Sequence, residues 1–172
     1  MEKAKTNEKR PPVTERIRTM EDVMKELGTD HPLVKEYHNW LETTDPELRS
    51  DYTATFLQLR MVCEALNEEC FPFEHCDFVY WPWLAVYTNK EDIPDYFIRT
   101  GKYFKIQDSV RRVLFGGIAC YGSSAGFAYA YSRYAPSLSR TNVGSRLCFK
   151  TRELAMHAAE HFAELWLKFY FM

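Results

Sequence analysis

The sequence predicts an α+β fold with a helical N-terminal half, then a small and mainly antiparallel sheet, then a C-terminal helix. Two observations support this prediction. Before residue 68, apolar side chains recur every three or four positions, as they do along one face of a helix. After residue 70, short aromatic and β-branched runs alternate with glycine and proline, which is typical of strands and turns.

The length of 172 residues is that of one domain, and 46% hydrophobic with 27% charged residues is a globular composition. Residues 1–15 are polar and basic and contain Pro11 and Pro12, so we expect a flexible tail followed by one domain over 16–172. A net charge of -2 provides no general attraction for nucleic acid or an anionic membrane.

No apolar stretch follows the charged start, and none approaches the roughly 20 residues that a spanning helix needs. We therefore expect no membrane span and synthesis in the cytoplasm. The odd number of cysteines favours reduced thiols. A virion component is also made in the cytoplasm, so a virion-associated place stays open. The cysteines are Cys63, Cys70, Cys76, Cys120 and Cys148.

Three helices are predicted in the N-terminal half. In "TMEDVMKELG", Thr19 and Asp22 have the spacing of a capping box, and Gly28 ends the helix. "HPLVKEYHNWLETT" forms a second helix that ends before Pro46. A longer helix is expected over 48–67. Its apolar stripe consists of Phe56, Leu59, Val62, Cys63 and Leu66.

The strands are expected in the second half. "FVYWPWLAVYT" is predicted to be a strand, in which Pro82 indicates an edge or a bulge. "NKEDIPD" is a charged loop, and "YFIRTGKYFKI" is predicted to be a hairpin that turns at Thr100 and Gly101. Further strands are expected in "SVRRVLFGGIACYG", "GFAYAYSRYAPS" and "VGSRLCF".

The chain ends in a predicted helix, "RELAMHAAEHFAELWLKFYFM". Thr151 is its expected N-cap, and Glu153 suits the positive end of the helix dipole. Its core stripe is predicted to be Leu154, Ala158, Phe162, Leu165 and Phe169.

Two groups of metal-ligating residue types occur, but neither predicts a metal site. "HAAEH" places His157 and His161 on one helix face in the order of inverted zincins, yet no third ligand follows downstream. We expect a half-exposed helix face there. The second group consists of Cys63, Cys70, His75 and Cys76. It lacks the paired spacing of zinc knuckles, so we expect its cysteines to be buried or half-buried free thiols. No metal or cofactor is implied.

Enzyme motifs are not found. The chain has no Ser-His-Asp order, no nucleophile elbow, no Walker loop and no dinucleotide fingerprint. "FGGIACYG" lacks the lysine and the following helix that a phosphate loop requires. An enzyme is therefore not indicated.

The stretch "GFAYAYSRYAPSLSRTNVGSRLCFK" has the most unusual composition. On a strand, Phe127, Tyr129, Tyr131 and Arg133 would occupy one face, and small residues the other. Rigid aromatic groups beside a cation are typical of binding hot spots. Periodicity alone leaves a second interpretation equally open, in which the tyrosines belong to the core.

The C-terminal third resembles the variable proteins of diversity-generating retroelements. The matching elements are a double glycine at Gly116 and Gly117, single glycines at Gly122 and Gly126, an Ala-Pro-Ser turn at 135–137, and the final Val-Gly-Ser-Arg-Leu at 143–147. This resemblance implies a C-type-lectin-like fold, related to the formylglycine-generating enzymes, in a protein encoded by a phage or prophage. It implies neither calcium-dependent sugar binding nor sulfatase modification, because the residues for those functions are missing. The N-terminal half matches no motif of the family.

The resemblance also implies a rule of composition. Such elements diversify adenines, chiefly in asparagine codons, and these changes cannot produce Lys, Glu, Gln, Met or Trp. All five residue types are absent from 115–149 and common elsewhere in the chain. A tight sheet of small residues and tyrosine would avoid long charged side chains as well.

The resulting hypothesis is a non-enzymatic protein that binds a protein or another macromolecule through a diversified surface within 121–142. One alternative is a small phage protein that sequesters a small molecule or nucleotide in a concave pocket. Another is a structural virion or assembly protein whose aromatic face forms a homo-oligomer. The expected ligand-binding residues are Tyr121, Ser123, Phe127, Tyr129, Tyr131, Arg133, Tyr134, Leu138, Arg140 and Asn142.

Overall fold

The computed structural model describes residues 10–68, 78–87, 90–100, 104–105, 127–136 and 147–171. This part of the chain is rich in helix and also contains a small antiparallel sheet. The elements are α1 (Val13–Arg16), α2 (Met20–Leu27), α3 (Pro32–Thr43), η1 (Pro46–Leu48), α4 (Asp51–Leu66), β1 (Phe78–Tyr87), η2 (Lys90–Asp92), α5 (Asp95–Thr100), β2 (Phe104–Lys105), β3 (Phe127–Pro136), α7 (Arg152–His161) and α8 (Ala163–Phe171).

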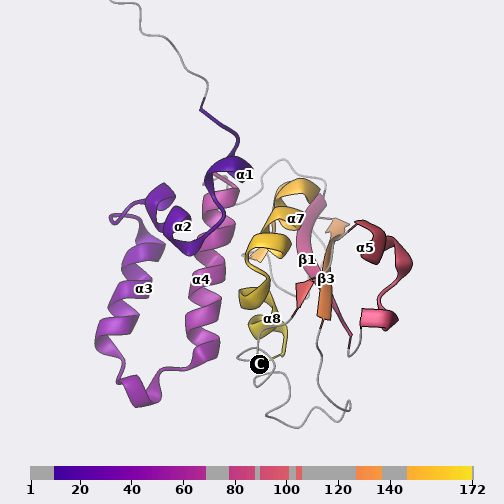
Figure 1. The fold of residues 1–172 in the computed structure, drawn as a ribbon. Helices are drawn as coiled ribbons and strands as arrows, with labels where there is room; N and C mark the ends of the chain where they lie inside the picture. Colours follow the sequence, from indigo (N-terminus) through magenta and orange to yellow (C-terminus); the bar gives the residue numbers. More distant parts are fainter. Residues whose placement is uncertain are drawn as a thin grey trace, which may run out of the picture.

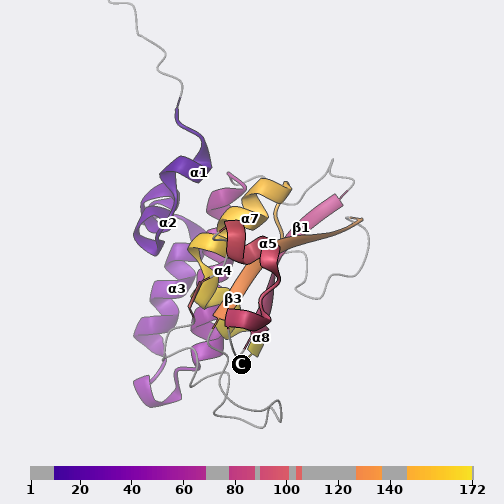
Figure 2. The same cartoon turned by 45° about the vertical axis from the view of Figure 1, so that its right-hand side comes forward.

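The elements form layers in an order that differs from their order along the chain. Figure 1 shows α2, α3 and α4 on one side, the sheet and α5 on the other, and the C-terminal helices α7 and α8 between them. α7 contacts both long strands, β1 and β3, while α8 contacts α4 and β1 (Figures 1 and 2). The C-terminal helices therefore join the helical half to the sheet. Within the described residues, no helix is both long and apolar enough to cross a membrane.

The flexible tail predicted over residues 1–15 is too long, because the described structure begins at residue 10. Val13 opens α1 and is buried, and Ile17 directly after the helix has no exposed surface. Arg10 forms an ion pair of 2.8 Å with Glu26 of α2. Residues 10–15 thus pack against the helical half because Val13 and Ile17 add to its core. Residues 1–9 lie outside the described residues.

The predicted N-terminal helices are confirmed. The Thr19 side chain accepts a hydrogen bond from the backbone of Asp22, and the Asp22 carboxylate accepts one from the backbone of Thr19, which completes the capping box of α2. Gly28 ends this helix at a φ of 80°, a value that glycine adopts without strain. In α4, the predicted stripe faces the core, with only Phe56 partly exposed.

The sheet has the strand order β1-β3-β2 and is antiparallel throughout. Among the described strands β1 is an outer one, which agrees with the edge position that Pro82 predicted as one of two possibilities, since a proline cannot donate a hydrogen bond to a neighbouring strand. Beyond this edge, Phe149 exchanges two backbone hydrogen bonds with Tyr80, of 3.0 and 2.7 Å. β3 is the central strand, and it contains the tyrosine-rich part of the unusual stretch.

The hairpin predicted in "YFIRTGKYFKI" is wrong in its first half. Asp95–Thr100 forms the short helix α5, and only Phe104 and Lys105 of the described residues pair as a strand, with β3. Pro94 precedes α5 and Asp95 lies in its first turn, which are both favourable at the start of a helix. These helix-start signals explain why the segment is helical although its aromatic residues favour a strand.

The single C-terminal helix was also an incorrect prediction, because α7 and α8 are separated at Phe162. The backbone of Phe162 has φ -118° and ψ 29°, outside the helical region. The Thr151 cap is confirmed and accepts a hydrogen bond from the backbone of Leu154. Of the predicted stripe, Leu165 and Phe169 are only partly buried, whereas Trp166 and Leu167 have no exposed surface.

Two further predicted strands lie wholly or mostly outside the described residues. "SVRRVLFGGIACYG" lies outside the described residues, and so does most of "VGSRLCF". Residues 147–149 of "VGSRLCF" are described, and they are completely buried. Phe149 makes a strand-like contact, because its backbone pairs with that of Tyr80.

Candidate functional site

The end of the unusual stretch is fixed to α4 by one buried asparagine. Asn67 is 1% exposed, and its side-chain amide donates a 2.9 Å hydrogen bond to the carbonyl of Cys148. Its side-chain oxygen accepts a 3.0 Å hydrogen bond from the backbone of Lys150. The Lys150 ammonium group in turn donates a 3.0 Å hydrogen bond to the Asn67 carbonyl. We call residues 147–149, held in this way, the anchor.

Charged groups lie around Lys150, the residue that follows the anchor. Glu68 lies between the ammonium of Lys150, at 3.7 Å, and the guanidinium of Arg16, at 3.0 Å. Arg16 also forms an ion pair with Glu26 of α2. This network connects α1, α2 and the end of α4 with the residue that follows the anchor.

The register of the sheet determines which candidate residues share a face. Residues directly opposite each other in an antiparallel pair lie on the same face. Tyr129 is opposite Ala85, and Tyr131 is opposite Trp83; both β1 residues are half-buried. Arg133 is opposite Trp81, which is buried. Positions 127, 129, 131 and 133 therefore share one face, and this face is covered at the Trp81 end.

Tyr134 belongs to the other face. β3 keeps a regular register as far as Pro136, and Tyr134 is opposite Tyr80 there. A single flat surface cannot therefore include both Tyr134 and the alternating set from Phe127 to Arg133. The remaining predicted ligand-binding residues lie outside the described part of the chain; they are Tyr121, Ser123, Leu138, Arg140 and Asn142.

Small residues lie where α7 approaches the sheet. Ala155, Ala158 and Ala159 of α7 have no exposed surface, and this helix contacts both β1 and β3. Alanine side chains allow a helix to lie close to a sheet without loss of packing density. The close contact holds β3 in place from one side while β1 pairs with its backbone.

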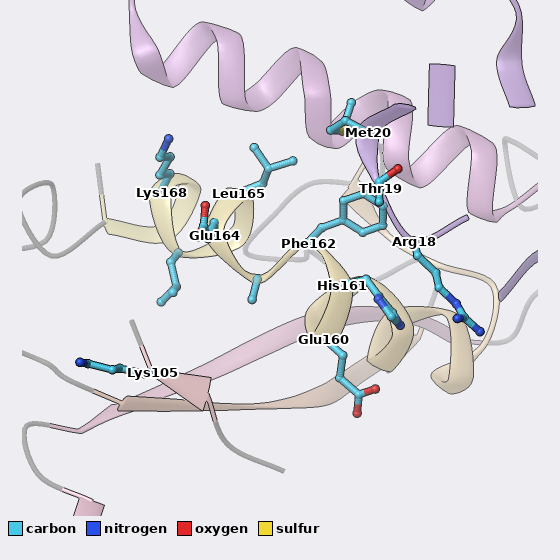
Figure 3. A pocket seen from close by; sticks show the side chains of 12 residues that line it. Arg18, Thr19, Met20, Lys105, Glu160, His161, Phe162, Glu164, Leu165 and Lys168 are labelled. Atoms are coloured by element: carbon cyan, nitrogen blue, oxygen red, sulfur yellow. The ribbon is translucent and has the colours of Figure 1, made fainter. Parts of the chain in front are cut away.

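A depression of about 530 Å³ lies at the junction of α7 and α8. Figure 3 shows its side chains coming from the segment before α2, from β2 and from both C-terminal helices. Sequence patterns could not reveal it, because the described lining combines three stretches that lie far apart along the chain, 18–20, 105 and 160–168. The lining residues are Arg18, Thr19, Met20, Lys105, Glu160, His161, Phe162, Ala163, Glu164, Leu165, Leu167 and Lys168.

The two histidines of "HAAEH" lie beside this depression. His157 and His161 have ring centroids 4.3 Å apart, and Nε2 of His157 is 2.6 Å from the carbonyl oxygen of Ile17. Burial lowers the pKa of His161, and the nearby His157 and Arg18 lower it further, since a second positive charge is unfavourable there. His157 is half-buried and His161 exposed, as the sequence predicted.

Two cysteines lie in the core, Cys63 on α4 and Cys148 in the anchor, and neither is part of a disulfide. Burial raises the pKa of the Cys63 thiol well above its usual value. No group of three or more His, Cys, Asp or Glu residues is suited to holding a metal ion in the described part of the chain. Cys70, His75 and Cys76 lie outside it.

Comparison with known proteins yields no match: no family model, no curated protein and no solved structure is significantly similar to this chain.

Proposed function

We propose that the chain is a non-enzymatic binding protein that presents a diversified set of side chains on a C-type-lectin-like scaffold. The observation that supports this most directly is the position of β3. The tyrosine-rich stretch forms the central strand of the sheet, and it lies within 115–149, where Lys, Glu, Gln, Met and Trp are absent.

The way in which β3 is held suits a strand whose side chains vary. Its pairing with β1 and β2 uses backbone N–H and C=O groups, which every residue except proline provides in full. A change of side chain therefore leaves the ladder intact. A scaffold that accepts many sequences at one surface needs this property.

The boundary of the unusual composition coincides with a structural boundary. The composition rule ends at Phe149, and Lys150 begins the contacts with Asn67 and Glu68. In this proposal the anchor belongs to the fixed frame, and the changes occur upstream of it. The frame also includes Gly126, Pro136 and the residues 143–147.

The partner is a protein or another macromolecule with a surface that accepts aromatic contacts. Tyrosine contributes a large contact area with few rotatable bonds, and arginine adds charge-assisted hydrogen bonds. Tyr129 and Tyr131 are the strongest candidates on β3, because their β1 neighbours are half-buried, whereas Arg133 pairs with the buried Trp81.

Alanine substitution tests the role of the strand. Tyr129→Ala and Tyr131→Ala should each lower the free energy of unfolding by less than about 1 kcal/mol, as expected for side chains outside the core. Thermal unfolding of the purified variants measures this. A loss of several kcal/mol would assign the tyrosines to the core and would overturn the proposed surface.

The coding sequence provides an independent test of diversification. We expect a near-copy of the region encoding 115–149 close by in the source genome, differing mainly at adenines, next to a gene for a reverse transcriptase. A genome in which neither feature accompanies the gene would contradict active diversification.

A further inference from the structure

The depression between α7 and α8 carries charges that are not paired with each other. Its permanent cations are Arg18, Lys105 and Lys168, and its carboxylates are Glu160 and Glu164. Among the described residues, none of these five side chains takes part in an ion pair. This distinguishes them from Arg16 and Arg60, which are both paired with glutamates. The cations are in excess and are available to a ligand.

The cations come from different elements and meet at two ends of the depression. Figure 3 shows the Arg18 guanidinium beside the His161 ring at one end, and Lys105 and Lys168 at the other. Arg18 belongs to the segment that precedes α2, and His161 ends α7. A guanidinium and an imidazole side by side provide several N–H donors for one anionic group.

Apolar side chains lie between the two ends. Phe162 extends toward Met20 and Thr19, and Leu165 follows on α8 (Figure 3). Phe162 is 5% exposed and belongs to the core, whereas Met20 and Leu165 are only partly buried and offer apolar surface to a ligand. The volume of about 530 Å³ lies within the roughly 300–1,000 Å³ that is usual for small-molecule pockets.

We propose that this depression binds a small amphiphile with one anionic head group, with the head at Arg18 and His161 and the apolar body over Met20 and Leu165. Lys105 is opposite Phe127 of β3, so the depression borders the proposed β3 surface, but the head-group and apolar contacts at Arg18, His161, Met20 and Leu165 do not depend on the function proposed for that surface. It takes a free small molecule, in contrast to the macromolecular partner of the strand.

The surroundings of His161 agree with an anionic head. Besides burial, the positive charge of Arg18 and the proximity of His157 disfavour its protonation, while Glu160 favours it. From the other elements, Lys105 of β2 and Glu164 and Lys168 of α8 also line the depression. A bound anion would offset the repulsion among the cationic groups and would favour the protonated ring.

Calorimetric titration of the full chain with octanesulfonate, far below its micelle concentration, tests the proposal. We expect saturable binding of one molecule per chain, and at least tenfold weaker binding of octylammonium. Arg18→Gln should weaken octanesulfonate binding by about tenfold, the effect of one lost charge-assisted contact. Arg152→Gln is the matched control, because Arg152 is exposed at the opposite end of α7 and should leave the affinity unchanged.

The apolar body is tested separately by chain length. From butanesulfonate to octanesulfonate, each added methylene should strengthen binding by about fourfold while it stays over Met20 and Leu165. Affinity independent of chain length would reduce the site to an adventitious ion contact and would overturn the proposal. Equal binding of octylammonium, or an unchanged affinity in Arg18→Gln, would also overturn it.

A pH series and vesicles complete the test. Octanesulfonate keeps its charge, so binding should strengthen as the pH falls through the lowered pKa of His161, and His161→Gln should remove this gain. Vesicles of anionic phospholipid distinguish a membrane surface from a free ligand. Binding to vesicles without binding to the single amphiphile would contradict a pocket for a free molecule.

Discussion

The two described parts of 115–149 are held in different ways. The anchor at 147–149 is completely buried and depends on particular side chains, above all on Asn67 of α4. The described contacts of β3 are those of its backbone, which pairs with β1 along its whole length and with β2 at one end. One stretch of unusual composition thus contains a part that is fixed by particular side chains and a part whose described contacts are backbone pairs.

This difference indicates where sequence change is tolerated. Backbone pairing stabilises a strand whatever side chains point away from the core, whereas a buried side chain must fill its site. The proposed surface requires variation to be accepted at Tyr129 and Tyr131 and rejected at the anchor. The following predictions, from the largest expected effect to the smallest, test this contrast.

The largest effect is expected at Phe149. Its side chain is fully buried, and its ring centroid lies 6.3 Å from that of Trp166. Phe149→Ala should lower the free energy of unfolding by about 3–5 kcal/mol, because it removes apolar contacts and leaves a cavity. Urea denaturation measures this loss. If Phe149→Ala cost no more than Tyr129→Ala, the contrast between anchor and strand would be wrong.

A smaller loss is expected at Asn67. Asn67→Ala removes a donor from the Cys148 carbonyl and an acceptor from the Lys150 backbone, and both partners lie in a largely buried place. The free energy of unfolding should fall by about 2 kcal/mol, the effect of buried polar groups left without partners. Hydrogen exchange of the Lys150 amide should become faster.

Asn39 provides the control for this change. It is exposed on α3, and no hydrogen bond of its side chain is found within the described residues. Asn39→Ala should leave both the unfolding free energy and the exchange of Lys150 nearly unchanged. An equal effect of the two substitutions would mean that Asn67 does not hold the anchor.

The smallest effect concerns the helical half at low pH. Hydrogen bonds from the Arg18 backbone and from the Thr19 side chain lower the pKa of Asp22 below its usual 3.8. Because the folded pKa is the lower one, the stabilisation is complete above the unfolded value and is lost as the pH falls through the folded value. The melting temperatures of the wild type and Asp22→Asn should differ above about pH 5 and converge in stronger acid.

Glu21→Gln serves as the control, because Glu21 lies in the same helical turn and accepts no hydrogen bond within the described residues. Its melting temperature should follow that of the wild type over the whole pH range. A difference between wild type and Asp22→Asn that persisted unchanged in acid would contradict the role of the carboxylate in the cap.

Local signals were sufficient to predict most helices. The cap at Thr19, the stop at Gly28, the break before Pro46 and the N-cap at Thr151 each depend on residues a few positions apart. Such contacts form within one segment, so the sequence alone specifies them. Pro82 likewise indicated an edge or a bulge, and β1 is an outer strand among those described.

The errors arose where distant packing decides. The break at Phe162 has neither glycine nor proline beside it, and it allows α7 to lie on the sheet while α8 lies on α4. The change from small side chains such as Ala158 to large ones such as Trp166 was the available signal. The depression at this break was missed for the same reason, since it exists only where separate elements meet.

The sequence by itself determined the helix caps, the alternation along β3 and the unusual composition of 115–149, because each depends on neighbouring residues. Only the tertiary structure decided that Tyr131 shares a face with Trp83 while Tyr134 lies on the other, that Asn67 holds the anchor, and that Arg18 stands beside His161. Register and long-range contacts result from how the layers pack, and the residues that meet there are far apart along the chain.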